Sequence, residues 1–326
     1  MKTLSFLVIA LFLCVTGLSA QKSVDFSKLV FEETDNNSLV YTQFVAKTSL
    51  STPVSNDQKV FMDLGAGEAL VFQAKDDKLY VEAEIVTSVR NEKKIAEDLR
   101  KNLDLSIKVT DDKVRLTSIF DYNDEDAKIS NGFLSSPERR VNLKIYVPAN
   151  RKIDLKDRSG DLEINEIEND IKIVDNSGGI RIDGLEGNLR LIDHSGEIAI
   201  KNVNLKQTEE MEIEIDDTSG AIYLTNARGE TIIDDTSGEI KIRNLDGSLE
   251  IDDTSGGISA KEIKGNSKVD DTSGEITLVG IDGNVSIADS SGGIYVDDVS
   301  KDVTLRRDGS GSFTTRNIKG DVITKN

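Results

Sequence analysis

The 326-residue chain has no tryptophan, one histidine, one cysteine and three prolines, and only 5% of its residues are aromatic. With a single cysteine, Cys14, no disulfide can form within the chain. So few aromatic side chains leave little bulk for a large globular core. We therefore expect stability to come from backbone hydrogen bonds and from a thin core of β-branched and other aliphatic residues.

Positive charge is also scarce. Lys and Arg number 40 against 59 Asp and Glu, which gives a formal net charge of −19. A protein with this charge repels phosphate backbones and anionic lipid, so we expect no nucleic-acid partner. The acidity favours solubility, cations or a basic partner.

The first twenty residues resemble an export signal. A short positive start is followed by an apolar run from Leu4 to Val15 and then by small residues. This order predicts a signal peptide, residues 1–20, removed after Ala20, and the run is too short for a comfortable membrane span. Lipid attachment at Cys14 is not expected, because Leu13 stands where a lipoprotein has a small residue. We therefore expect an exported protein, periplasmic, on the outer surface or extracellular, whose mature chain has no integral span.

An 18-residue repeat dominates the chain from about Ile153 onward. Each repeat contains a Ser-Gly pair with an aspartate two residues before the serine. The spacing is 18, except for 24 after Ser195 and 19 after Ser291. The serines are Ser159, Ser177, Ser195, Ser219, Ser237, Ser255, Ser273, Ser291 and Ser310. Nine matches in one phase indicate a tandem array of coils.

Each repeat contains two short stretches in which apolar and polar residues alternate. Ile240 and Ile242 flank Lys241, and a similar stretch begins at Leu249. A period of two predicts strands with one buried face, which coil-on-coil stacking would cover. The expected columns are Ile240, Ile258, Ile276 and Ile294; Leu249, Ser267, Val285 and Val303; and, as an end plug, Leu185, Val203, Leu245, Ile263, Ile281 and Val299.

The pattern predicts an all-β fold, a parallel β-solenoid of about nine coils over residues 151–326. The preference of parallel crossovers favours a right-handed path. The extra residues after Ser195, around Asn204 to Glu210, are expected to loop out without breaking the stack.

Residues 21–150 lack the repeat and are expected to cap the open end of the solenoid and to supply irregular first coils. Alternating patterns predict strands, and apolar residues at helical spacing predict one helix near residues 91–103. The predicted strands span residues 60–64, 79–87, 105–109, 113–120 and 141–147.

Three stretches resemble a known family: Ile145-Tyr146-Val147-Pro148, the segment from Asp157 to Ile164, and the repeated Asp-Thr-Ser-Gly-Glu-Ile coils. In these the chain resembles the bacterial "putative adhesin" family of exported β-solenoid domains, which is related to the GIN-type head domains of autotransporter adhesins. The resemblance covers roughly residues 55–326. It implies the solenoid fold and an adhesin-like role, and it supplies no active-site residues.

The aspartates raise the question of a cation. Carboxylates stacked on successive coils would repel by about 0.9 kcal/mol per pair even in water. One remedy is local, since each carboxylate can accept the backbone N–H two residues on, as in an Asx-turn. The other is calcium, which takes oxygen ligands. Its candidate ligands are the doubled aspartates Asp216, Asp217, Asp234, Asp235, Asp252, Asp253, Asp270 and Asp271.

No catalytic site is expected. Asp193, His194 and Ser195 offer acid, base and nucleophile, but neighbours in one turn cannot converge as a triad does. The leading hypothesis is a non-enzymatic envelope or surface protein that binds a glycan, an envelope component or a host protein. A carbohydrate-active β-helix enzyme and a calcium-stabilised structural spacer are the alternatives.

Overall fold

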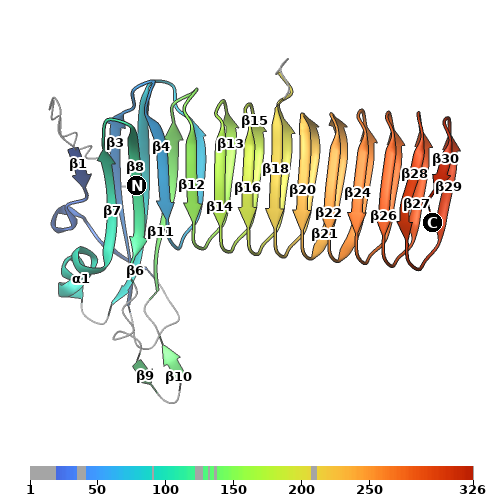
Figure 1. The fold of residues 1–326 in the computed structure, drawn as a ribbon. Helices are drawn as coiled ribbons and strands as arrows, with labels where there is room; N and C mark the ends of the chain where they lie inside the picture. Colours follow the sequence, from blue (N-terminus) through green and yellow to red (C-terminus); the bar gives the residue numbers. More distant parts are fainter. Residues whose placement is uncertain are drawn as a thin grey trace, which may run out of the picture.

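The computed structural model describes residues 20–34, 42–89, 92–121, 128–130, 133–135, 138–206 and 211–325. Two 14-stranded sheets, here called sheet A and sheet B, form the walls of a long rod (Figure 1). Within these ranges the one α-helix is α1 (Ile95–Asn102), and no described helix has the length and apolar character needed to cross a bilayer. The predicted signal peptide, apart from Ala20, lies outside the described residues.

Sheet A contains, in spatial order, β1 (Ala20–Ser23), β7 (Leu103–Val109), β8 (Lys113–Phe120), β4 (Lys59–Leu64), β12 (Ile153–Asp157), β14 (Ile171–Asp175), β16 (Leu189–Asp193), β18 (Glu212–Asp217), β20 (Glu230–Asp235), β22 (Leu249–Asp253), β24 (Ser267–Asp271), β26 (Val285–Asp289), β28 (Val303–Asp308) and β30 (Val322–Thr324).

Sheet B contains β2 (Glu32–Thr34), β3 (Thr42–Pro53), β6 (Lys78–Val89), β11 (Arg139–Val147), β5 (Ala69–Gln73), β13 (Leu162–Ile167), β15 (Ile180–Leu185), β17 (Ile198–Val203), β19 (Ile222–Arg228), β21 (Gly238–Asp246), β23 (Gly256–Ile263), β25 (Ile276–Ile281), β27 (Ile294–Val299) and β29 (Phe313–Ile318). A separate hairpin joins β9 (Lys128–Ser130) to β10 (Phe133–Ser135), and two 3₁₀ turns span Phe26–Lys28 and Glu92–Lys94.

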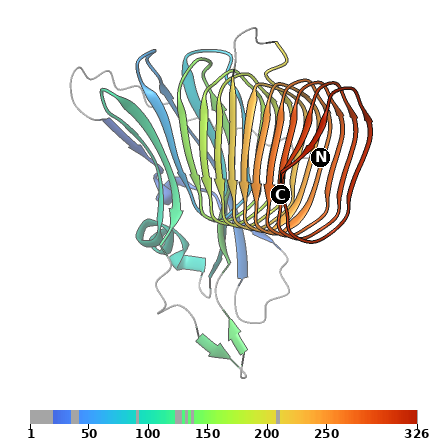
Figure 2. The same ribbon diagram turned by 45° about the vertical axis from the view of Figure 1, so that its right-hand side comes forward.

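The predicted parallel solenoid is confirmed, with the predicted register. Ile240 pairs with Ile258, which pairs with Ile276 and then Ile294. On the other wall the column of Leu249, Ser267, Val285 and Val303 is likewise in register and buried. Figure 2 shows the coils nested along the axis. Alternation fixes this register, because a slip of one residue would turn every apolar side chain outward.

One corner of each coil requires glycine. Gly256 has a φ of +152°, and a Cβ atom there would lie 1.6 Å from the carbonyl oxygen of Gly238 in the preceding coil. The same contact recurs from Gly160 to Gly311. The backbones of successive coils therefore touch at this corner, and no side chain fits between them.

The opposite corner uses left-handed residues that the sequence analysis did not single out. Asn202, Asn226 and Asn244 have φ values of 58°, 56° and 58°, and each precedes an inward plug residue. Their amides form a ladder, in which Asn244 Nδ2 donates to Asn226 Oδ1 at 2.9 Å and Asn226 Nδ2 to Asn202 Oδ1 at 3.3 Å. Asparagine suits this place because it tolerates a positive φ and can bond to its neighbour.

The long coil does not interrupt the stack. β16 still pairs with β18, and β17 with β19, across the insertion. Asn204 is buried at its start, where its Oδ1 accepts the backbone N–H of Gly187 at 2.7 Å. Residues 207–210 of the insertion lie outside the described residues.

The cap is mostly antiparallel, but its strands β4 and β5 already make a coil. They pair in parallel with β12 and β13, and Gly67 between them begins the glycine column. After this coil the chain forms strands β6 to β11 of the cap, and it continues the stack of coils at β12. The helix predicted near residues 91–103 forms over Ile95–Asn102, after the 3₁₀ turn at Glu92–Lys94.

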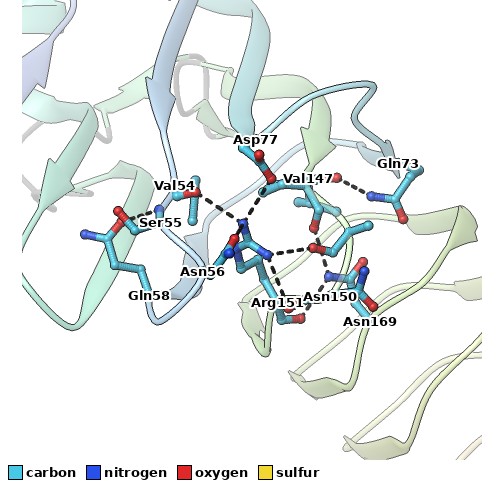
Figure 3. A network of polar contacts seen from close by, with 12 residues as sticks. Val54, Ser55, Asn56, Gln58, Gln73, Asp77, Val147, Asn150, Arg151 and Asn169 are labelled. Carbon is cyan, nitrogen blue, oxygen red and sulfur yellow. Dashed lines mark hydrogen bonds and ion pairs between the residues drawn. The ribbon is translucent and has the colours of Figure 1, made fainter.

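Arg151, just before β12, connects the cap to the start of the 18-residue repeat (Figure 3). Its guanidinium is buried and donates to Asn56 Oδ1 at 2.6 Å, to Asp77 Oδ1 at 3.0 Å and to the carbonyl oxygen of Ala149 at 3.0 Å. Asn169, also buried, donates to the carbonyl oxygen of Arg151 at 2.8 Å. This network holds two loops of the cap against the start of the repeat.

Candidate functional site

The aspartates that precede the first eight Ser-Gly pairs point into the solenoid. They form one column, here called the inner aspartate row, and each is at most 2% exposed. Asp217 pairs with Asp235, which pairs with Asp253 and then Asp271. The row comprises Asp157, Asp175, Asp193, Asp217, Asp235, Asp253, Asp271 and Asp289.

The expected Asx-turns are present. Oδ1 of Asp235 accepts the backbone N–H of Ser237 at 3.0 Å, and Oδ1 of Asp271 accepts that of Ser273 at 2.9 Å. The serine is used as well, because Ser273 Oγ donates to the carbonyl oxygen of Thr254 in the preceding coil at 3.4 Å. The glycine of the motif forms the corner where successive coils touch. In the Asp-Thr-Ser-Gly motif, the aspartate, the serine and the glycine therefore each have a structural role, and only the exposed threonine side chain has none.

The second oxygen of these carboxyls is not used in the turn. Oδ2 of Asp217 and of Asp253 is buried and has no hydrogen-bond partner among the described residues. Burial, followed by repulsion from Asp193 and Asp235, raises the pKa of Asp217 to about 7. Burial, followed by repulsion from Asp271, raises the pKa of Asp253 to about 6. The pKa values of these two carboxyls therefore lie well above that of an ordinary aspartate, and burial is the main cause.

The first member of each doubled pair points outward. Asp216, Asp234, Asp252 and Asp270 form the outer aspartate row on sheet A. Burial, with repulsion from Asp216 and Asp252, raises the pKa of Asp234. Because alternate residues of a strand face opposite sides, the two aspartates of one pair cannot hold the same ion. In the described part of the chain, no three acidic, histidine or cysteine side chains are grouped to hold a metal. Calcium binding, the alternative that the sequence left open, stays a hypothesis, and its test is given in the Discussion.

The structure accommodates the one 19-residue repeat, between Ser291 and Ser310, by a bulge in a strand. The extra residue lies in β28 as a bulge opposite Ile287 and Ala288. It lets Arg306 bond Asp270 and donate to Ser286 Oγ at 2.7 Å. The guanidinium of Arg306 thus pairs with the last member of the outer aspartate row, at its C-terminal end. An open hollow of about 370 Å³ lies beside it and is lined by Asp252, Thr272 and their neighbours.

His194 forms no catalytic group with its neighbours. One nitrogen of its ring lies 3.1 Å from the carbonyl oxygen of Asp175. Ser195 Oγ donates to the carbonyl oxygen of Asn176 at 3.2 Å, and Asp193 Oδ1 accepts the N–H of Ser195 at 3.2 Å. The two contacts of Ser195 are those of the turns in the other coils.

The cap carries an exposed feature that the sequence analysis missed. Tyr80, Tyr146 and Phe72 are register partners across β6, β11 and β5, and we call them the aromatic row. All three are half-buried and point away from the core, since Leu79, Val71 and Ile145 beside them are buried. The Phe72 and Tyr146 ring centroids are 5.7 Å apart. Tyr80 and Tyr146 each sit between two aliphatic residues in the sequence, and Phe72 follows one, but only strand pairing brings the three together.

Comparison with known proteins gives one family match and several similar solved structures. The family model described as Toastrack DUF4097 matches residues 59–323. A "putative lipid binding protein" of Parabacteroides distasonis is 16% identical with a TM-score of 0.40, and the match covers 86% of this chain and 97% of that chain. "Putative adhesins" of Parabacteroides distasonis and Parabacteroides merdae are 15% and 13% identical, with TM-scores of 0.27 and 0.25, covering 86% of this chain and 97% and 96% of theirs.

No curated protein matches the chain. The family match begins at β4, in the first coil, and ends in β30, the last described strand, so it spans the whole solenoid. The chain therefore belongs to the Toastrack DUF4097 family.

Proposed function

We propose that this protein is a non-enzymatic, exported envelope or surface protein that uses the flat sides of its solenoid to bind a partner, as an adhesin does. The observation that carries the proposal is the register of its outward side chains. Tyr223, Lys241, Ser259, Thr277 and Tyr295 stand on successive strands of sheet B in one straight row. Stacked repeats of this kind give long, rigid contact surfaces.

Charge narrows the choice of partner. A net charge of −19 disfavours nucleic acid and anionic lipid surfaces. The outer aspartate row presents its carboxylates side by side on one flat wall, whereas a glycosidase places two carboxyls on opposite sides of the bond that it cleaves. These features favour binding over hydrolysis.

The test combines location with binding. Antibody detection in fractionated cells of the source organism should find the protein in the envelope or the medium, and the purified chain should bind an envelope preparation without releasing reducing sugar ends. Retention in the cytosol, or failure to bind envelope and host-matrix preparations, would contradict the proposal. Release of reducing ends would favour the enzyme alternative.

A further inference from the structure

We propose that the aromatic row is the binding platform for an uncharged chain of pyranose sugars. The inference rests on the proposed function and names the site and the ligand class for it. Three rings stand on three adjacent strands and form an apolar strip on the outside of sheet B. The rings of Phe72 and Tyr146 are 5.7 Å apart by their centroids, with a tilt of 31° between their planes.

The strip has the dimensions of a short sugar segment. Adjacent strands are spaced by about 4.8 Å, so three strands carry rings over about 10 Å, enough for about two pyranose rings laid across them. A pyranose has one face of C–H groups and a rim of hydroxyls. The C–H face matches the π-face of a tyrosine or phenylalanine, which is apolar and carries negative charge density.

The surroundings of the strip offer partners for the hydroxyl rim. Lys144 Nζ lies over the faces of two rings, 5.4 Å from the Phe72 centroid and 5.5 Å from that of Tyr146, so a stacked sugar would take its place there and the ammonium would move to the hydroxyl rim. At one end Tyr80 donates its hydroxyl to Asp76 Oδ2 at 2.8 Å. On the next strand past Phe72, Asn165 is its register partner and faces the same side. Sugars need this combination of an apolar floor with charged and amide groups at its edge.

The charged side chains around the aromatic row favour an uncharged sugar over an anionic polysaccharide or an anionic lipid. Glu82 is the register partner of Lys144 on β6, and Glu163 lies one strand beyond β5 in the same lateral row. These carboxylates offset the lysine, so an anionic polysaccharide or an anionic lipid surface gains little attraction here. The rest of sheet B carries its outward tyrosines singly, as at Tyr223 and Tyr295.

The experiment uses the full mature chain and two matched double variants. Tyr80→Ala with Tyr146→Ala removes two rings of the strip, and Tyr223→Ala with Tyr295→Ala removes two outward tyrosines of the same sheet beyond it. Binding is measured to an envelope preparation, before and after periodate oxidation of its glycans and before and after protease, and to soluble hexasaccharides of glucose, mannose and N-acetylglucosamine, with heparin as the anionic probe. Thermal unfolding of each variant shows whether it folds.

The expected result is that periodate, but not protease, abolishes envelope binding, and that heparin binds no better than the neutral hexasaccharides. The strip variant should lose affinity by about tenfold for each ring, and the distant variant should bind as the parent does. Tyr146→Phe keeps the ring and should retain binding. If the double variant does not fold, two single variants replace it: Tyr146→Phe, which should still bind, and Phe72→Leu, which lacks one ring and should bind more weakly.

Two results overturn the inference and leave the proposed function intact. One is envelope binding that protease removes and periodate does not, because the partner is then a protein. The other is sugar binding that survives in the folded variants lacking the rings, because the site then lies elsewhere. Absence of any binding by the parent chain overturns the proposed function itself.

Discussion

The backbone N–H of Ser255 donates a hydrogen bond to Oδ1 of Asp253 at 3.0 Å, and Oδ2 of the same carboxyl is buried without a hydrogen-bond partner in the described structure. One oxygen therefore stabilises the turn, and the other favours protonation of the group. Because this arrangement recurs on successive coils, small effects at one aspartate add along the rod.

Stability should decrease as the pH rises through the range in which the inner aspartate row loses its protons. The pKa values of Asp235 and Asp271 are raised to about 6 and that of Asp217 to about 7, mainly by burial. A carboxyl whose pKa is higher in the folded state binds more protons there than when unfolded. Its stabilising effect is complete below about pH 4, the unfolded value, and is lost as pH rises through 6 and 7.

The measurement is the melting temperature between pH 4.5 and 8 at constant ionic strength, followed by circular dichroism. The melting temperature should be highest on the acidic side of this range. A protein that became steadily more stable from pH 5 to 8 would contradict the assignment of raised pKa values to the inner aspartate row.

Asp253→Asn and Asp253→Ala should have opposite effects at neutral pH. The amide keeps an oxygen that can accept the N–H of Ser255 and removes a buried charge, so the free energy of unfolding should rise by about 1 kcal/mol. Alanine removes the turn hydrogen bond and should lower it by about 1 kcal/mol. Urea unfolding at pH 5 and pH 8 checks both changes, and the gain from asparagine should shrink at pH 5. The outward Asp252→Asn is the control and should change stability less.

Gly256→Ala should destabilise the solenoid by at least about 3 kcal/mol, because the new methyl group would collide with the backbone of Gly238. Gly257→Ala is the matched control at the next residue, where a Cβ meets nothing within 4 Å, and it should change stability by less than about 0.5 kcal/mol. Equal melting temperatures for the two variants would show that the coils do not stack this closely.

Arg151→Ala should loosen the junction between cap and solenoid and lower the free energy of unfolding by about 2 to 4 kcal/mol. Most of this loss comes from the hydrogen bonds to Asn56 and to backbone oxygens, since Asp77 is 81% exposed and its ion pair is screened. Arg151→Lys should recover only part of it, because an ammonium cannot replace the planar fork. Exposed Arg158→Ala is the control. Limited proteolysis should show earlier cleavage in the cap only in the Arg151 variants.

Calcium should stabilise the chain no more than an equal ionic strength of sodium chloride does. Asp252 and Asp253 point to opposite faces of β22, so a doubled pair offers one carboxylate on each side and not a ligand set. Melting curves with calcium, with sodium chloride and with EDTA decide the point. A calcium-specific rise that Asp234→Asn and Asp252→Asn remove would establish a cation site on the outer aspartate row.

The repeat itself allowed the solenoid, its register and the turn role of the aspartates to be predicted. Alternation at Ile240 and Ile242 is a local property, and equal spacing of coils leaves one stacking that buries every apolar column. The same alternation places Asp217 in phase with the buried Ile213 and Ile215, so the sequence also contains the signal for an inward-pointing aspartate.

Only the tertiary structure decided what happens where the repeat is absent or irregular. Arg151 meets Asp77, Arg306 reaches Asp270, and Tyr80 joins Tyr146 through pairings between distant or displaced strands. Neither periodicity nor composition specifies such pairings, because they depend on how the cap strands β4 and β5 form a first coil and on where a single extra residue is placed. Local pattern thus determined the rod and its buried columns, and long-range strand pairing determined the junction and the aromatic row.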